Sequence, residues 1–354
     1  MIRIILYIVL FSGFVFSNIS AKLYKFEYQK DIAVGFSAEL ELTNRIGKIV
    51  ITGGETGQVT IRAEKYISAE SQADAERLSE YIKIDSHRNG NLISITTEHI
   101  IPPDKTKSFW EKLFGSKDEQ FGSVDFSIEV PSDCKIILDS QKGDISITGI
   151  SERIRLNSKM GIIELGNIVG NCDIKANGNV TISRLIGDLF LLAPMADISL
   201  KEVTGVINIE STTGNKKLED IKGNTSIEQS SGNVEISKLG GNLRIKSSSG
   251  KIDVEQISGG LNILGNRSNV AVKSRLDRPD DYFIETSSGN IRFSIPEGLS
   301  GSALMKTQNG EIKADLKLLV ETLTKTKVEG RFGNGRGPRI VLTSGSGDII
   351  LNSF

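Results

Sequence analysis

Residues 211–263 read STTGNKKLEDIKGNTSIEQSSGNVEISKLGGNLRIKSSSGKIDVEQISGGLNI, and this stretch decides the fold. Glycine recurs every 18 residues, at Gly214, Gly232 and Gly250, and a second set, beginning at Gly223, falls halfway between them. Self-similarity at a fixed period indicates a repeat architecture, in which each unit packs against the next one.

Apolar residues keep fixed positions after each leading glycine. Positions two and four are mostly isoleucine, leucine or valine, an alternation that predicts a β-strand rather than a helix. The seventh position is apolar too, and we expect its residues to stack in one interior column: Ile150, Ile168, Leu185, Val203, Ile221, Leu239 and Ile257. The glycines are expected at corners between short strands, where a side chain would crowd the backbone.

The pattern therefore predicts an all-β chain, a parallel β-solenoid or β-helix with coils of about 18 residues, each coil pairing with its copy ~4.8 Å away. The serine and threonine residues at the SSG and STTG corners are expected to form hydroxyl ladders rather than to be reactive nucleophiles. Regular coils begin at residue 133. Beyond residue 273 they loosen, with later coils led by Gly289, Gly310 and, after an inserted segment at 316–338, Gly347.

The N-terminal third is organised differently. Residues 1–21 form an apolar run after one arginine, with small residues at its end, which predicts a secretory signal peptide cut after Ala21. An uncleaved anchor is the alternative, but 13 apolar residues are short of the ~20 that span a bilayer. Residues 22–130 are expected to hold a first coil, a capping helix at 71–82 and a hairpin, and residues 131–354 the solenoid.

The tip of that predicted hairpin carries an apolar cluster. Phe109, Trp110, Leu113 and Phe114 lie among lysines in PPDKTKSFWEKLFGSKDEQFG, residues 102–122. One interpretation is an exposed tip that touches a membrane surface or a partner protein. The other, which we favour, is that the segment folds back over the open end of the solenoid.

Composition excludes several classes of partner. The formal net charge of the 354 residues is −1, and no basic run or zinc-type spacing points to nucleic acid. After signal cleavage no transmembrane span is expected, although contact with a membrane surface is possible. The two cysteines, Cys134 and Cys172, are expected to be unpaired, because they lie about two coils apart, ~10 Å by the strand spacing. Cys172 takes the inward position of Leu189 in the next coil.

Outward positions supply one candidate site for chemistry. Four carboxylates are expected on one face: Glu219, Glu235, Asp253 and Glu255. One interpretation is a patch that binds Ca²⁺ or supplies an acid/base pair. The other is a solvated face on which neighbouring lysines offset the repulsion between the carboxylates. We favour the solvated face. Glycine-rich runs such as residues 240–245 place aliphatic residues where a calcium β-roll needs aspartate, so no metal or cofactor is expected.

Several stretches carry a family resemblance. LELTNRIGKIVITGGETGQVTIRAEK from residue 40, VDFSIEVPSDCKIILDSQKGDISITG from 124, SSGNVEISKLGGNLRIKSSSGKIDV from 230 and LTSGSGDIIL from 342 resemble the "putative adhesin" family of bacterial β-strand-repeat proteins. The resemblance covers about residues 40–351. It implies a right-handed β-helical body in an exported bacterial protein, and it carries over no catalytic residues.

These observations lead to one expectation of function. We expect an exported, non-catalytic solenoid, periplasmic or at the cell surface, that binds an envelope or surface protein or a polysaccharide. The alternatives are a carbohydrate-active β-helix enzyme that uses the acidic face, and an envelope-stress signalling module that docks through the tip around Trp110.

Overall fold

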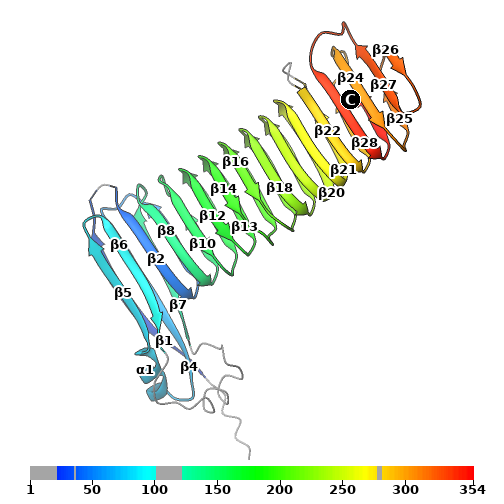
Figure 1. Ribbon diagram of the computed structural model, residues 1–354. Helices are drawn as coiled ribbons and strands as arrows, with labels where there is room; N and C mark the ends of the chain where they lie inside the picture. Colours follow the sequence, from blue (N-terminus) through cyan, green and yellow to red (C-terminus); the bar gives the residue numbers. More distant parts are fainter. Residues whose placement is uncertain (1–21, 36, 101–121, 277–280) are drawn as a thin grey trace, which may run out of the picture.

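The computed structural model describes residues 22–35, 37–100, 122–276 and 281–354. Most of this part of the chain is β-structure, with a single helix near the N-terminal end (Figure 1). The strands lie side by side along one long axis and join into one hydrogen-bonded sheet of 29 strands. Within that sheet the strands follow two rows, which we call ladder A and ladder B.

Ladder A begins at the N-terminal end with an antiparallel pair and ends with an antiparallel hairpin. In order along the stack its strands are β5 (Ile82–Asn89), β6 (Leu92–His99), β2 (Glu39–Ile46), β8 (Lys135–Lys142), β10 (Ile154–Ser158), β12 (Cys172–Ala176), β14 (Leu189–Leu192), β16 (Ile207–Glu210), β18 (Thr225–Ser231), the first parts of β20 (Leu243–Ser258) and β21 (Leu261–Ser274), β22 (Asp281–Ser288), β28 (Arg339–Ser346), β24 (Gly301–Thr307), β27 (Lys327–Phe332) and β26 (Leu318–Leu323).

Ladder B is the opposite row, and it also starts with antiparallel strands. Its order is β1 (Lys22–Ala33), β4 (Gln58–Ala69), β7 (Gly122–Pro131), β3 (Ile49–Gly54), β9 (Ile145–Thr148), β11 (Ile163–Val169), β13 (Val180–Ile186), β15 (Ile198–Thr204), β17 (Lys216–Lys222), β19 (Val234–Gly240), the second parts of β20 and β21, β23 (Ile291–Ile295), β29 (Ile349–Ser353) and β25 (Ile312–Asp315). One strand of each ladder and the corners between them make one coil.

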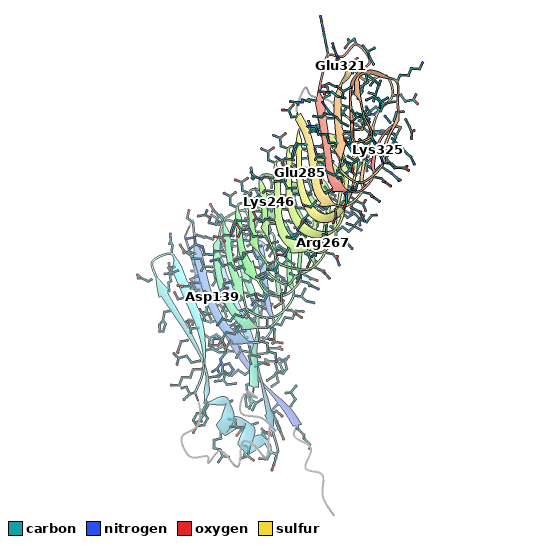
Figure 2. The ribbon with its side chains drawn as sticks, turned by 45° about the vertical axis from the view of Figure 1, so that its right-hand side comes forward. Asp139, Lys246, Arg267, Glu285, Glu321 and Lys325 are labelled. Carbon is teal, nitrogen blue, oxygen red and sulfur yellow. The ribbon has the colours of Figure 1, made fainter. Side chains whose placement is uncertain are left out.

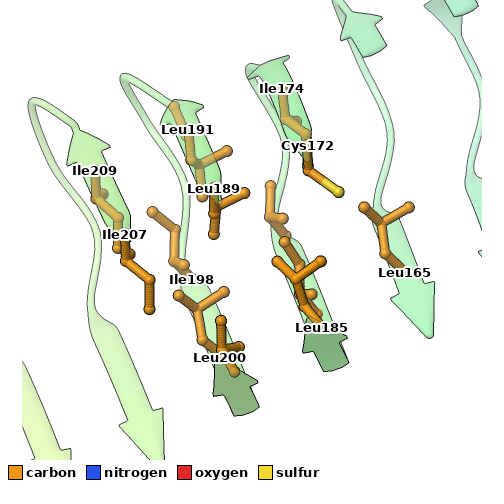
Figure 3. Packing of buried hydrophobic residues seen from close by; sticks show 14 of the residues in the cluster. Leu165, Cys172, Ile174, Leu185, Leu189, Leu191, Ile198, Leu200, Ile207 and Ile209 are labelled. Carbon is orange, nitrogen blue, oxygen red and sulfur yellow. The ribbon is translucent and has the colours of Figure 1, made fainter. Parts of the chain in front are cut away.

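Parallel register brings equivalent residues of neighbouring coils together. In ladder B, Val234 faces Lys216 on one side and Ile252 on the other. The interior between the ladders is filled by the apolar positions that the repeat defined, as Figure 3 shows for Leu185, Leu189 and Ile198 among others. The predicted inward position of Cys172 is confirmed, since it pairs with Leu189 and is 2% exposed.

The predicted column at the seventh position is confirmed for six of its seven residues. Ile150, Ile168, Leu185, Val203, Ile221 and Leu239 are fully buried, but Ile257 is 38% exposed. In five of those six coils the residue before the column adopts a left-handed φ between 53° and 56°: Asn167, Arg184, Glu202, Asp220 and Lys238. Gly149 takes that place in the remaining coil, with φ of 75°.

This left-handed residue acts as a bulge that shifts the alternation by one, so the next residue points inward. The coil of Ile257 lacks the bulge, and a register shift falls between β19 and β20. Gln256 therefore takes the inward place, and its amide donates to the carbonyls of Gly241 and Gly260, both at 3.0 Å. A one-residue slip moves the isoleucine to the outer face, which is why the prediction for Ile257 is wrong.

Corners are held by glycine and by side-chain amides. A Cβ on Gly232 would lie 2.0 Å from the carbonyl oxygen of Gly214 in the previous coil, and its φ is +121°. After the leading glycine, Asn215 accepts from the backbone N–H of Asn233, and Asn233 accepts in turn from that of Lys251, at 3.1 and 3.0 Å. At the SSG corners Ser231 lies opposite Ser249 of the next coil, as expected for stacked hydroxyl residues, and the N–H groups of Ser230 and Ser231 donate to the carbonyl of Thr212.

Both ends of the stack depart from chain order. The first coil, β2 with β3, lies between β6 with β7 on one side and β8 with β9 on the other. The last coil, β28 with β29, lies between β22 with β23 and β24 with β25. The inserted segment forms the β26–β27 hairpin, which pairs with β24 and ends ladder A. At each end, the coil nearest the chain terminus is enclosed on both edges.

The predicted helix is present, though shorter than expected. Helix α1 (Gln72–Ser79) begins where the Ser71 hydroxyl accepts from the N–H of Asp74, at 3.2 Å, and it packs on β4, β1 and β5. Ile82 belongs to β5 instead, because the chain turns there into the antiparallel pair with β6. An eight-residue helix cannot cross a bilayer, and no other helix occurs in the described residues.

Candidate functional site

A long groove follows the outer face of ladder A, at the ends of its strands. One hollow of about 900 Å³ extends from β14 to β22, and a second of about 810 Å³ continues over β28, β24 and β27. The two hollows share Glu285 and Ser287, so they form one groove, which we call the edge groove. It runs along the stack axis and crosses the strands.

The floor of the edge groove is a column of outward residues that the register aligns strand by strand. Its members are Leu192, Glu210, Glu228, Lys246, Leu264, Glu285, Thr343 and Lys306. Figure 2 shows Lys246 and Glu285 of this column following one another along the stack. The column is polar for most of its length because its positions face away from the apolar interior.

Hydroxyl and amide groups line the rest of the groove. The hydroxyl residues are Ser211, Thr212, Ser230, Ser247, Ser248, Thr286, Ser287, Thr307, Thr326, Thr343 and Ser344, and the amides are Gln229, Asn266 and Gln308. Lys246 and Glu228 form an ion pair at 3.3 Å, and both side chains are exposed, so solvent screens the pair. None of the described lining residues is a histidine, a cysteine or an aromatic residue. The exposed groups among them can therefore exchange hydrogen bonds with a polar chain.

Behind the groove, one coil carries an unusual interior residue. Lys216 occupies the inward place of Ile198 and Val234 in the adjoining coils and is 1% exposed. Its ammonium donates to the hydroxyl of Ser211 and the carbonyl of Gly214, both at 2.8 Å, and to the carbonyl of Thr213 at 3.3 Å. Burial lowers the pKa of Lys216 to about 8, opposed only in part by the charge of Asp197.

The acidic residues predicted as a face lie on ladder B, on the opposite side from the edge groove. Glu235 is directly opposite Asp253 and Lys217, whereas Glu219 faces Lys201 and Ser237. Glu255 faces Lys273, and Lys251 forms an ion pair with Asp253 at 2.6 Å. The structure thus brings Glu235 and Asp253 together and places lysines beside all four carboxylates. In the described part of the chain, no group of three or more acidic, histidine or cysteine side chains is arranged to hold a metal ion.

The remaining sequence candidates have a different outcome. Phe109, Trp110, Leu113 and Phe114, the predicted tip, lie outside the described residues. The predicted signal peptide at residues 1–21 also lies outside them. The edge groove was not predicted, because its lining comes from nine strands and each residue alone resembles an ordinary solvated position. Lys216 was detectable, since it interrupts an otherwise apolar column at the second position after glycine.

Comparisons with known proteins give a family and little else. No match was found among curated protein sequences. Similar solved structures include a "putative cell adhesion protein" from Clostridium sporogenes, with 10% identity, coverage of 94% of this chain and 100% of that one, and a TM-score of 0.20. Another is a "putative adhesin" from Bacteroides fragilis, with 11% identity, coverage of 93% of this chain and 97% of that one, and a TM-score of 0.25. A third is a "putative lipid binding protein" from Parabacteroides distasonis, with 11% identity, coverage of 91% and 96%, and a TM-score of 0.28.

At these TM-scores, superposition on the neighbours carries no argument about function. The family profile is more informative, because it spans the first coil, both ladders and the last coil, residues 39–352. The chain belongs to the Toastrack DUF4097 family.

Proposed function

We propose that this protein is an exported, non-catalytic β-solenoid with an adhesin-like role, which binds an extended polar polymer of the cell envelope or cell surface along its edge groove. The observation that carries the proposal is the continuity of that groove. It crosses nine strands of ladder A, from β14 to β27, which at ~4.8 Å per strand is a length of roughly 38 Å. A site of this length fits a linear chain better than a compact small molecule.

The chemistry of the lining supports a polar ligand. Exposed hydroxyls such as those of Ser230 and Ser248 both donate and accept, and the exposed amides of Asn266 and Gln308 add further donors and acceptors. Apolar lining in the first hollow is limited to a few side chains such as Leu192, Pro194 and Leu264. Contacts of this kind, repeated along a rigid stack, give affinity by number rather than by one deep pocket.

Export and coil geometry belong to the same proposal. The apolar run at residues 4–16 and the small residues at Ser20 and Ala21 support a signal peptide. The glycine period supports a coil of about 18 residues, and the family resemblance supports its right-handedness. Expression of the full chain, followed by cell fractionation and N-terminal sequencing, tests the first point. We expect the mature chain to start at Lys22, in the periplasm or at the cell surface. An intact chain in the cytosol would contradict export.

Groove binding is tested by filling the groove. Ser230 is an exposed lining residue, and Ser230→Trp would place a large ring across the hollow. The matched control is Ser199→Trp, an exposed serine on ladder B. We expect the parent chain and the control to co-sediment with isolated cell-wall and surface polysaccharide, and the Ser230→Trp variant to lose most of this binding. Equal binding by all three folded proteins would refute the role of the groove.

The two sites predicted from sequence remain proposals with their own tests. If the acidic face were catalytic, Glu235→Ala with Asp253→Ala would abolish turnover of a polysaccharide; we expect no turnover in the parent chain. If the tip docks on membranes or partners, Trp110→Ala with Phe114→Ala would weaken that binding. We expect no loss, because we place the tip as a cap.

A further inference from the structure

A second hollow, of about 520 Å³, lies on the outer face of ladder A near the beginnings of the same strands. Its centre is a row of outward residues in direct register, Asn208, Ser226, Arg244, Asn262 and Phe283. Phe190, which is 38% exposed, continues the row next to Asn208. We call this site the Arg244 hollow. Two aromatic rings thus bracket a strip of amide, hydroxyl and guanidinium groups.

The side chain of Arg244 has no partner among the described residues. Its guanidinium group makes no ion pair or hydrogen bond there, and its register neighbours, Ser226 and Asn262, are both uncharged. Arg155, which lies further along ladder A at the equivalent outward position, pairs with Asp173 at 3.8 Å instead. The other charged residue that lines the hollow is Asp281, and the register places it directly opposite Arg339. Within the described residues, the guanidinium group of Arg244 therefore faces the hollow without a carboxylate partner.

The amides beside it are also available. The side-chain amides of Asn208 and Asn262 make no hydrogen bond with described residues, so each offers an NH₂ donor and a carbonyl acceptor to the hollow. The main chain of these strands has no unpaired edge to offer a ligand. Strands β16 to β22 are hydrogen-bonded to a parallel neighbour on both edges, so a peptide cannot add a strand here. Recognition must come from side chains alone.

These groups match the parts of an acidic sugar. A guanidinium binds a carboxylate with two parallel hydrogen bonds, and amides bind hydroxyl groups as both donor and acceptor. The face of a phenylalanine ring offers apolar surface to the C–H side of a pyranose. We propose that the Arg244 hollow binds a short run of uronic-acid residues of a linear acidic polysaccharide, with one carboxylate on Arg244, hydroxyls of successive sugars on Asn208 and Asn262, and one sugar ring against Phe283.

This inference rests on the proposed polymer-binding role of the outer face of ladder A, but it names a different hollow and a charged ligand. The two can therefore fail separately. The probe is polygalacturonate, compared with the same polymer after reduction of its carboxyl groups and with inorganic polyphosphate of similar length. Binding is measured by isothermal titration calorimetry at low and at physiological salt.

The test variants are Arg244→Ala, Arg244→Lys and Phe283→Leu, with Arg155→Ala as the matched control from the same outward row. We expect Arg244→Ala to weaken polygalacturonate binding by about tenfold to a hundredfold, as expected for a hydrogen-bonded charge pair. Arg244→Lys should recover only part of the affinity, because lysine lacks the planar fork. Phe283→Leu should cost a few-fold, and Arg155→Ala should change nothing beyond experimental error.

Each other outcome overturns the inference. Equal binding of the carboxyl-reduced polymer would mean that the carboxylate is not recognised. Equal, Arg244-dependent binding of polyphosphate would mean that only charge is sensed. If Ser230→Trp abolished binding of the surface polysaccharide but Arg244→Ala left polygalacturonate binding intact, the edge groove would stand and the Arg244 hollow would not.

Discussion

Burial of Lys216 makes the stability of the protein depend on pH in a predictable direction. Its pKa is about 8 in the folded protein, against 10.5 for an unperturbed lysine, so the unfolded chain binds the proton more tightly. Below pH 8 the lysine is charged in both states, and folding bears the full cost of burying that charge. Between pH 8 and 10.5 the folded state releases its proton first and the cost disappears. The difference amounts to about 3 kcal/mol.

The assay compares the parent chain with Lys216→Met by chemical denaturation, followed by far-ultraviolet circular dichroism, at pH values from 7 to 10.5. Methionine keeps the length of the aliphatic chain, but it leaves the carbonyls of Thr213 and Gly214 without this donor, so the sign of the difference at pH 7 is not the test. The slope is the test. We expect the parent to gain about 3 kcal/mol relative to the variant across this range.

A matched control separates this effect from other titrations. Lys217 is the next residue on β17, and its side chain is exposed on the outer face. The Lys217→Met variant should follow the parent within experimental error at every pH. If the difference between the parent and Lys216→Met stays constant from pH 7 to 10.5, Lys216 is hydrated in the folded protein and the reasoning is wrong.

Three further predictions concern the corners and the core. Gly232→Ala should prevent folding or lower the melting temperature sharply, because its Cβ would lie 2.0 Å from a carbonyl oxygen and its backbone φ is +121°. As the control, Gly54→Ala should melt like the parent, because nothing lies within 4 Å of the added Cβ. Glu202→Gly should raise the free energy of unfolding by roughly 0.5–1 kcal/mol in a denaturant titration, because a left-handed φ of 56° strains any residue with a Cβ; no gain would mean that the bulge is unstrained. Burial raises the thiol pKa of Cys134 and of Cys172 to about 12, so neither should react with a thiol reagent at pH 8 until denaturant is added, and fast labelling of the native protein would contradict their burial.

The repeat in the sequence was sufficient to predict the interior of the stack. Apolar residues at fixed positions, such as Leu185 and Val203, have one arrangement in which all are buried, and the register follows from it. The case of Ile257 shows where this reasoning stops. Residue 256 is polar, as are most residues at its position in earlier coils, and the sequence holds no signal that its backbone leaves the left-handed conformation. A single dihedral angle decides which of two neighbours is buried.

The order of the coils at the two ends could not be read from the sequence either. Periodicity reports that a segment can form a coil, but it does not report which coil lies beside it. The edge groove and the Arg244 hollow depended on the same missing information, since each collects residues such as Glu228 and Glu285, or Asn208 and Phe283, from strands far apart in the chain. The sequence pointed to ladder B and to the tip, because one carries a run of carboxylates and the other an apolar cluster. The edge groove and the Arg244 hollow are lined by residues that look like ordinary exposed positions when each is taken alone.

Enclosure of the last coil between two earlier ones has a consequence for synthesis and for deletion. While the chain is being made, the row formed by β22 and β23 and the row formed by β24 and β25 are complete before the residues that separate them exist. The C-terminal rows must therefore stay apart, or pair wrongly, until residues 339–353 are available to insert between them. Deleting residues 339–353 would remove β28 and β29 from between their neighbours, so β24 and β25 would lose the strands that pair them with the rest of the stack.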